Sequence, residues 1–265
     1  GEQRWLKHLV DDLGGKRPRW GFAGAPLLAG GLLVVEPGGD GSSLVALDPA
    51  TGDERWRAGS DKAGYSAPVL FPHGEGKGVA IFNAFGLVAY SLENGGELFR
   101  QRWETDYDVN AATPLYYAGH FFVCSGYGTG GGLISVKGET PELIYETRDA
   151  IAQFQSPVRV GEHLYIVSGD NSKKSRLACL NFVDGSLAWS EKLGGNRGNV
   201  IAIGDKLIAV SERGEAILCA ASPEDFTELG RFQASRPNVW AAPAFAGGIF
   251  YVRNNDGSLQ AWDMR

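Results

Sequence analysis

Residues 44–56 read Leu44-Val-Ala-Leu-Asp-Pro-Ala-Thr-Gly-Asp-Glu-Arg-Trp56, and this stretch decides the fold of the 265-residue chain. A short apolar run ends at an Asp, a turn containing Pro and Gly follows, and an aromatic residue closes the stretch. Gly supplies the positive φ that such a turn needs, and the Asp side chain can bond the turning backbone. The stretch therefore predicts two short strands joined by a tight turn.

The apolar run recurs five more times, at a period of about 43 residues. The third residue of every copy is small, which indicates a close approach between neighbouring sheets. The six copies are Leu44–Asp48, Leu87–Ser91, Leu133–Lys137, Leu177–Asn181, Ile217–Ala221 and Leu259–Asp263. A second apolar stretch precedes each copy, and hairpin signals such as Ala29-Gly-Gly31 separate the two. Each unit is therefore expected to form four short strands, which is the pattern of a β-propeller blade.

An aromatic residue follows the turn in most repeats. Trp56 is the clearest case, and we assign Trp103 and Trp189 to the same place in later repeats. We expect these rings to lie between adjacent blades as core packing, where truncation of a ring to Ala costs about 3–5 kcal/mol.

The two ends of the chain look complementary. The last repeat stops at Arg265 before its aromatic strand, while Gly1-Glu-Gln-Arg-Trp5 matches Gly52-Asp-Glu-Arg-Trp56. The N-terminal segment could supply the missing outer strand, which would leave no interrupted blade. We therefore expect an all-β protein, a single propeller domain over residues 1–265, with six four-stranded blades and the last blade completed by the N-terminal strand.

Composition excludes several classes of protein. The net charge is −6 and no basic run occurs, so nucleic acid is not an expected partner. No apolar stretch approaches the length of a membrane span. We expect the protein to be a monomer. No segment resembles a signal peptide, but the chain opens in mid-motif, so this says nothing about secretion. Cys124, Cys179 and Cys219 have no disulfide or metal spacing, and we interpret Cys179 and Cys219 as packing thiols.

The repeats resemble the PQQ-like (quinoprotein-type) β-propeller family, and within it the BamB-like bacterial subgroup. Leu44–Trp56 is close to the family pattern "LxALDxxTGxxxW", with weaker copies at Leu87–Trp103 and Leu177–Trp189. Pro18-Arg-Trp-Gly-Phe22 and Tyr107-Asp-Val-Asn-Ala-Ala-Thr-Pro114 are similar to the subgroup. The resemblance implies a periplasmic or secreted protein. Such relatives usually carry eight blades, so six blades implies either a trimmed larger ring or, as the matching ends favour, a closed six-bladed variant.

The same resemblance raises an enzymatic alternative, a degenerate or true PQQ-dependent oxidoreductase. It would imply a disulfide between adjacent cysteines, a calcium site with acidic ligands and a catalytic Asp. No two cysteines are neighbours here, and no motif marks the acidic cluster. We therefore predict no catalytic residue, no metal site and no cofactor, with PQQ and calcium as the less favoured alternative. A hydrolase using carboxylates such as Asp108 and Asp170, and a structural module of a longer chain, also stay open.

Binding residues are expected on the loops that share one mouth of a propeller channel, namely those that precede the first strand of each blade and those between its second and third strands. These loops are rich in aromatic, Arg and amide side chains, which suit a protein, peptide or glycan ligand. Trp20 and Trp240 are the first choices for a stacking contact, because neither takes the place between blades. The predicted ligand-binding residues are Trp20, Tyr65, Asp108, Asn110, Tyr127, Gln155, Arg197, Asn199, Arg236 and Trp240. The alternative for each is that it only satisfies loop backbone. The predicted function is a non-catalytic binding or scaffold protein.

Overall fold

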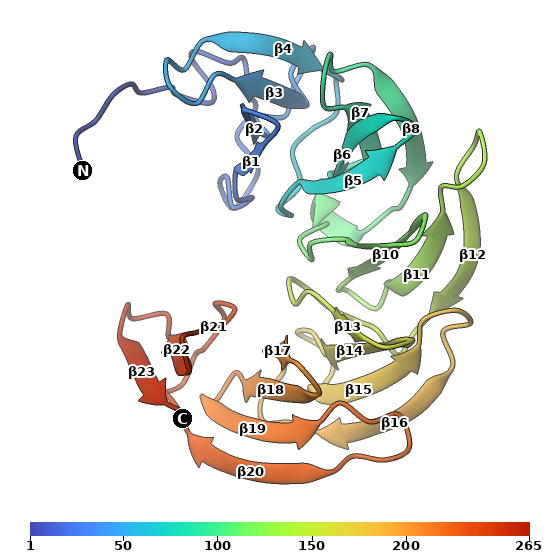
Figure 1. Cartoon of the computed structure of the whole chain (residues 1–265), viewed down its shortest axis with the longest axis vertical. Coiled ribbons are helices and arrows are strands. Elements are labelled where there is room, and N and C mark those ends of the chain that lie inside the picture. Colours follow the sequence, from blue (N-terminus) through green and yellow to red (C-terminus); the bar gives the residue numbers. More distant parts are fainter. The chain divides into compact units, whose positions relative to one another are not determined.

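The computed structural model describes residues 1–265, which form six antiparallel sheets and a single turn of 3₁₀ helix, η1 (Asp106–Asp108) (Figure 1). Every sheet is built from strands consecutive in the chain, so the predicted repeat unit is the structural unit. The first two sheets are β1 (Leu27–Ala29), β2 (Leu32–Val35), β3 (Leu44–Leu47) and β4 (Glu54–Ala58), then β5 (Val69–His73), β6 (Gly76–Phe82), β7 (Gly86–Ser91) and β8 (Glu97–Arg102).

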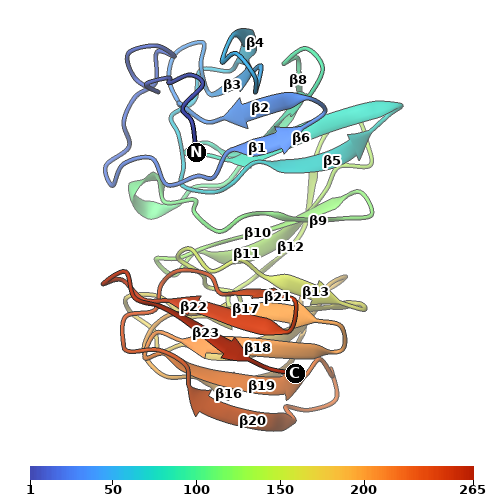
Figure 2. The same ribbon diagram turned by 60° about the vertical axis from the view of Figure 1, so that its left-hand side comes forward.

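The third and fourth sheets are β9 (Leu115–Tyr117), β10 (His120–Ser125), β11 (Gly130–Ser135) and β12 (Glu142–Thr147), then β13 (Val158–Val160), β14 (His163–Ser168), β15 (Arg176–Asn181) and β16 (Leu187–Lys192). The last two are β17 (Gly198–Ile203), β18 (Lys206–Ser211), β19 (Glu215–Ala220) and β20 (Glu228–Gln233), then β21 (Ala244–Ala246), β22 (Ile249–Arg253) and β23 (Leu259–Asp263). Figure 2 shows β17 to β20 side by side in this order. None of the elements is a helix of the length and apolarity that a membrane crossing requires.

The chain divides into two compact units. Unit 1 comprises Gly1–Val123 and Ile134–Glu142, and unit 2 comprises Cys124–Leu133 and Leu143–Arg265. Each has its own apolar clusters, for example around Val79 and Val88 in unit 1 and around Val167 and Leu207 in unit 2. A single domain over the whole chain stays a prediction.

The aromatic residues between sheets lie where the repeat predicts them. Trp56 lies opposite Ala46 in the register of β3 and β4, and its Nε1 donates to the carbonyl oxygen of Leu92 in the next sheet (2.9 Å). Trp189 lies opposite Cys179, and its Nε1 donates to the carbonyl oxygen of Ser222 (2.8 Å). In both cases the small residue on the third strand, Ala46 or Cys179, leaves room for the Trp ring opposite it. The ring in turn covers the turn between the third and fourth strands of the next sheet.

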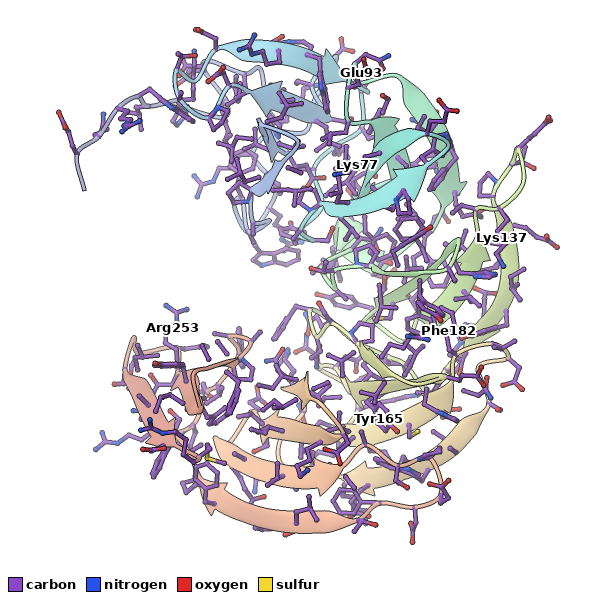
Figure 3. The ribbon with its side chains drawn as sticks, in the orientation of Figure 1. Lys77, Glu93, Lys137, Tyr165, Phe182 and Arg253 are labelled. Atoms are coloured by element: carbon purple, nitrogen blue, oxygen red, sulfur yellow. The ribbon has the colours of Figure 1, made fainter.

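Other rings fill the same space. The Tyr145 hydroxyl donates to the carbonyl oxygen of Phe182 (2.9 Å), a residue labelled in Figure 3. Tyr165 of β14, labelled in the same figure, packs 6.0 Å from the Trp189 ring. Cys124, Cys179 and Cys219 are buried free thiols, which confirms the packing role predicted for the last two.

One aromatic was assigned to the wrong residue. Phe99, not Trp103, lies opposite Ala89 and so takes the place that Trp56 takes opposite Ala46. Phe99 packs against Phe71 and Phe121, whereas Trp103 follows the end of β8 and packs against Phe82. The cause is the register: the turn at Gly95 and Gly96 brings Phe99 opposite the small residue, and the larger ring lies farther along.

The predicted outer strand of the last sheet does not form. That sheet contains only β21, β22 and β23, and residues 1–5 lie in no strand. Trp5 nevertheless takes the docking place of an outer-strand aromatic, because its Nε1 donates to the carbonyl oxygen of Pro49 (3.0 Å) and its ring lies against Gly52. The side chain alone anchors this segment, so the backbone pairing that the sequence match predicted is absent.

Candidate functional site

The ten predicted binding residues fall into two groups, one in each unit. Trp20, Tyr65, Asp108 and Asn110 belong to unit 1; Tyr127, Gln155, Arg197, Asn199, Arg236 and Trp240 belong to unit 2. All but Asn199 lie in loops or in η1, and Asn199 is the second residue of β17.

The unit 1 group is built on a group of aromatic rings in tilted and edge-to-face contact, which we call the Trp20 cluster (Arg19, Trp20, Tyr65, Tyr107). The centroid of the Trp20 ring lies 5.9 Å from that of Tyr65 and 6.3 Å from that of Tyr107. The guanidinium carbon of Arg19 lies 5.1 Å from the Trp20 centroid and 5.4 Å from the Tyr107 centroid. Trp20 and Tyr107 are 54% and 60% exposed, so two of the three rings face solvent over much of their surface.

Two further predicted residues flank the Trp20 cluster. Asp108 forms a salt bridge with Lys62 (3.4 Å), and both side chains are exposed. The buried Asn110 amide donates to the carbonyl oxygens of Asn83 (2.8 Å) and Trp103 (3.2 Å) and accepts from Thr105. Asn110 therefore fixes loop backbone rather than facing solvent.

The unit 2 group centres on a buried arginine, and we call it the Arg197 cluster (Gln153, Phe154, Asn171, Arg197, Glu212, Trp240). Arg197 Nε donates to Gln153 Oε1 (3.0 Å), and its terminal nitrogens donate to Glu212 Oε1 (3.1 Å) and to Asn171 Oδ1. Arg197 is only 7% exposed. A buried guanidinium requires such partners, because an unpaired buried charge is strongly destabilising.

Two aromatic rings cover this arginine. The Arg197 guanidinium carbon lies 4.9 Å from the Trp240 centroid and 5.8 Å from the Phe154 centroid. The two rings lie 5.7 Å apart at 41°. Trp240 Nε1 also donates to Glu212 Oε1 (2.9 Å), so both the face and the edge of this ring are held, although Trp240 is 42% exposed.

Glu212 accepts hydrogen bonds from both Arg197 and Trp240, and these bonds help to lower its pKa. Burial alone raises the pKa of this carboxyl, but hydrogen bonds from the Asn196 N–H and the Trp240 indole, together with the Arg197 guanidinium, leave the pKa below its ordinary value. Glu212 is therefore ionised at neutral pH and neutralises Arg197.

The remaining predicted residues of unit 2 differ in exposure. Tyr127 is half-buried and its hydroxyl accepts a hydrogen bond from Gln153 Nε2 (3.1 Å). The buried amides of Gln155 and Asn199 donate to loop carbonyls, those of Gly169 and of Trp240 respectively. Arg236 is exposed. Tyr127 thus extends the Arg197 cluster, while Gln155 and Asn199 hold its backbone.

Strained backbone marks both groups. A positive φ is rare for a residue other than Gly, and such residues often lie at functional sites. Tyr107 (φ 63°) and Asp108 (φ 58°) adopt it in unit 1, and Tyr127 (φ 56°) and Asn238 (φ 30°) adopt it in unit 2. Only one other non-glycine residue, Ala118 in a hairpin turn, does so.

Four residues of the Arg197 cluster are not among the ten predictions, namely Gln153, Phe154, Asn171 and Glu212. They stand in loops that precede a first strand or join a second strand to a third, but nothing local to them shows that they converge. One signal in the sequence could have paired Glu212 with Arg197. Arg197 lies in the loop before the first strand of its blade and Glu212 in the loop between the second and third strands, and both kinds of loop are expected at the same end of a blade.

The residues expected of a quinoprotein enzyme are not assembled. The three cysteines come from β10, β15 and β19 of three different sheets, so none can form the adjacent pair. No three His, Cys, Asp or Glu side chains are grouped in a way that could hold a metal ion. The donor set thus does not fit a quinone with calcium, and the absence of a cofactor stays a prediction.

Comparisons with known proteins give a family and a fold. The family model described as outer membrane protein assembly factor BamB matches residues 1–191. No curated protein matches the chain significantly.

Among solved structures, BamB from Moraxella catarrhalis is 14% identical with a TM-score of 0.50, and the match covers 92% of this chain and 85% of that one. The β-propeller domain of Cps50 (Swd1) from Myceliophteria thermophila is 13% identical with a TM-score of 0.63, covering 94% and 85%. The computationally designed Ika8 protein is 12% identical with a TM-score of 0.65, covering 91% and 70%. These likenesses establish a β-propeller fold, in which the six sheets are the blades.

Proposed function

The chain belongs to the family of the outer membrane protein assembly factor BamB, and from this premise we propose that it is a non-catalytic propeller that binds a polypeptide segment of a partner protein through the Arg197 cluster. A scaffold or binding role is what a propeller of this family supports. The family also supports a bacterial protein in a periplasmic or secreted location. Binding through one cluster is compatible with the monomer that we expect.

The observation that carries this proposal is that Trp240 is both displayed and fixed. Its ring is 42% exposed, yet Glu212 holds its edge and Arg197 its face. Immobilising a side chain on binding costs free energy, and a ring that is already immobile avoids that cost. Trp and Arg are also the residues most enriched at positions that dominate binding energy.

The geometry favours a polypeptide over a glycan. A sugar stacks best on a flat, open ring face, but Arg197 already covers Trp240, and Phe154 is tilted 41° against it. The rings therefore form an angled apolar surface that suits an aliphatic or aromatic side chain. Asn171 lies beside it, is exposed, and has an amide nitrogen that can donate to a peptide backbone.

Selection of ligands from a random-peptide phage library, with a glycan array in parallel, tests the proposal. We expect enriched peptides whose affinity falls about 30-fold in Trp240→Ala, equivalent to about 2 kcal/mol. Trp20→Ala is the matched control, since it removes the same ring from the other unit, and it should leave the affinity within about twofold. Failure to enrich any peptide, equal losses in both variants, or binding to glycans alone would contradict the proposal.

The enzymatic alternative has a separate test. Titration of the protein with PQQ and calcium should leave the Tm and the visible spectrum of the quinone unchanged. A shifted quinone band together with a raised Tm would establish cofactor binding and overturn the non-catalytic assignment.

A further inference from the structure

A cavity of about 210 Å³ in unit 1 contains one carboxylate among apolar side chains. It lies between the segment before β1, the end of β2 and the loop before β5. Its lining includes the side chains of Phe22, Pro26, Val35 and Glu36 and the backbone of Gly24 and Gly64. Glu36 is the only ionisable side chain in this lining, and it directly follows the last residue of β2.

The carboxylate of Glu36 has a donor but no cation. Its Oε1 accepts a hydrogen bond from the Gly64 N–H (3.0 Å), and no charged side chain is among the groups that act on it. Its second oxygen lies on the side of Gly24, 3.7 Å from where a Cβ on that residue would stand. Glu36 is half-buried among apolar side chains, where an ionised carboxylate is costly unless it is paired, so its second oxygen is suited to accept a hydrogen bond from a cation.

Burial accordingly raises the pKa of Glu36 to about 8, with only the Gly64 N–H opposing the shift. No neighbouring charged side chain contributes, which agrees with a lining that holds no other ionisable group. Glu36 is therefore mostly protonated at pH 7, and a cation bound beside it would favour its ionised form.

We propose that this cavity binds a protonated primary amine at the end of an apolar stem, with Glu36 as the counter-ion. The volume admits a short alkyl chain, which Phe22, Pro26 and Val35 would contact, and the ammonium would lie at the free carboxylate oxygen. A small alkylamine and a lysine side chain of a polypeptide share this chemistry. The site is independent of the Arg197 cluster, which belongs to unit 2.

The aromatic rings nearby do not offer a competing site. Trp20 and Tyr65 are close in sequence to the lining residues Phe22 and Gly64, but Arg19 already lies over the Trp20 ring. A second cation on that ring would meet the charge of Arg19, so the Glu36 carboxyl, which ionises when a cation binds beside it, is the favoured position.

Calorimetric titration with n-butylamine, with the capped peptide acetyl-Gly-Lys-Gly-amide and with uncharged n-butanol tests the inference. We expect butylamine to bind, butanol to bind at least tenfold more weakly, and Glu36→Gln to lose at least tenfold in amine affinity, as for a charge-assisted hydrogen bond. Glu93→Gln removes an exposed carboxylate of the same unit and should change nothing. Binding of the peptide as well as butylamine identifies a lysine side chain as the source, and binding of butylamine alone identifies a free amine.

The proton balance gives a second readout. Titration at pH 7 in buffers of different ionisation enthalpy should show release of close to one proton per amine bound, and almost none at pH 9, where Glu36 is already ionised. Glu36→Gln should keep its Tm at pH 7, since it replaces a mostly neutral carboxyl with an amide of nearly the same shape. Equal affinity for butanol and butylamine, or amine binding without proton release that persists in Glu36→Gln, would overturn the inference.

Discussion

Arg19 in unit 1 and Arg197 in unit 2 each lie over two aromatic rings, but only one of them is held in place. Arg19 forms no salt bridge and stacks on the exposed rings of Trp20 and Tyr107. Arg197 is buried, with Glu212 and two amide side chains on its nitrogens. An arginine beside exposed aromatic rings is thus not enough to fix their positions. In unit 2 the carboxylate of Glu212 pairs with the buried arginine, and this pairing holds the arginine and the ring above it in place.

The largest expected effect comes from removing that counter-charge. Glu212→Ala leaves the Arg197 guanidinium buried without an anion and should lower the free energy of unfolding by about 2–4 kcal/mol. Lys62→Ala, which breaks the exposed pair with Asp108, should cost less than about 1 kcal/mol. Urea denaturation at pH 7 measures both values. Similar losses for the two variants would remove the distinction between the clusters.

Truncation of the displayed rings should give a smaller difference in the same direction. Trp240→Ala loses the stacking on Arg197 and the hydrogen bond to Glu212, which together should cost about 1–2 kcal/mol. Trp20→Ala loses only exposed ring contacts and should cost less than about 1 kcal/mol. Thermal unfolding followed by circular dichroism ranks the two, and a greater loss for Trp20→Ala would reverse the comparison.

The smallest effect concerns pH. Because the folded pKa of Glu212 is lowered, its ionisation stabilises the fold fully above the ordinary pKa of about 4.5, and this contribution is lost as the pH falls through the folded pKa. The stability difference between the native protein and Glu212→Gln should therefore be constant from pH 5 to 7 and narrow below pH 4.5. A constant difference down to pH 3 would show that the charge of Glu212 contributes nothing.

Most of the strand pattern could be predicted from the sequence, because strand period and turn chemistry are local. Leu44–Asp48 was expected to be a strand and β3 spans Leu44–Leu47, with Trp56 covering the next sheet as predicted. The exceptions depended on non-local facts. Phe99 rather than Trp103 docks because of register, and Gly1–Trp5 forms no strand because backbone pairing needs a partner in space.

The candidate site was less predictable, because side chains in irregular loops follow no period. Trp20 and Trp240 were chosen for lacking a place between blades, and both are exposed. Asn110 and Gln155 have the same loop setting in the sequence, yet their amides are buried on backbone carbonyls. The pairing of Glu212 with Arg197 depends on the three-dimensional course of two loops.

The most direct test of the central claim, that the fixed Arg197 cluster is the binding surface, is an indole N–H NMR titration. The chain contains 7 Trp residues, and Trp20→Phe and Trp240→Phe identify the two displayed indoles by the loss of one signal each. Addition of a peptide from the phage selection should shift the Trp240 signal and leave the Trp20 signal in place. A shift confined to Trp20, or a bound peptide that moves neither signal, would contradict the claim.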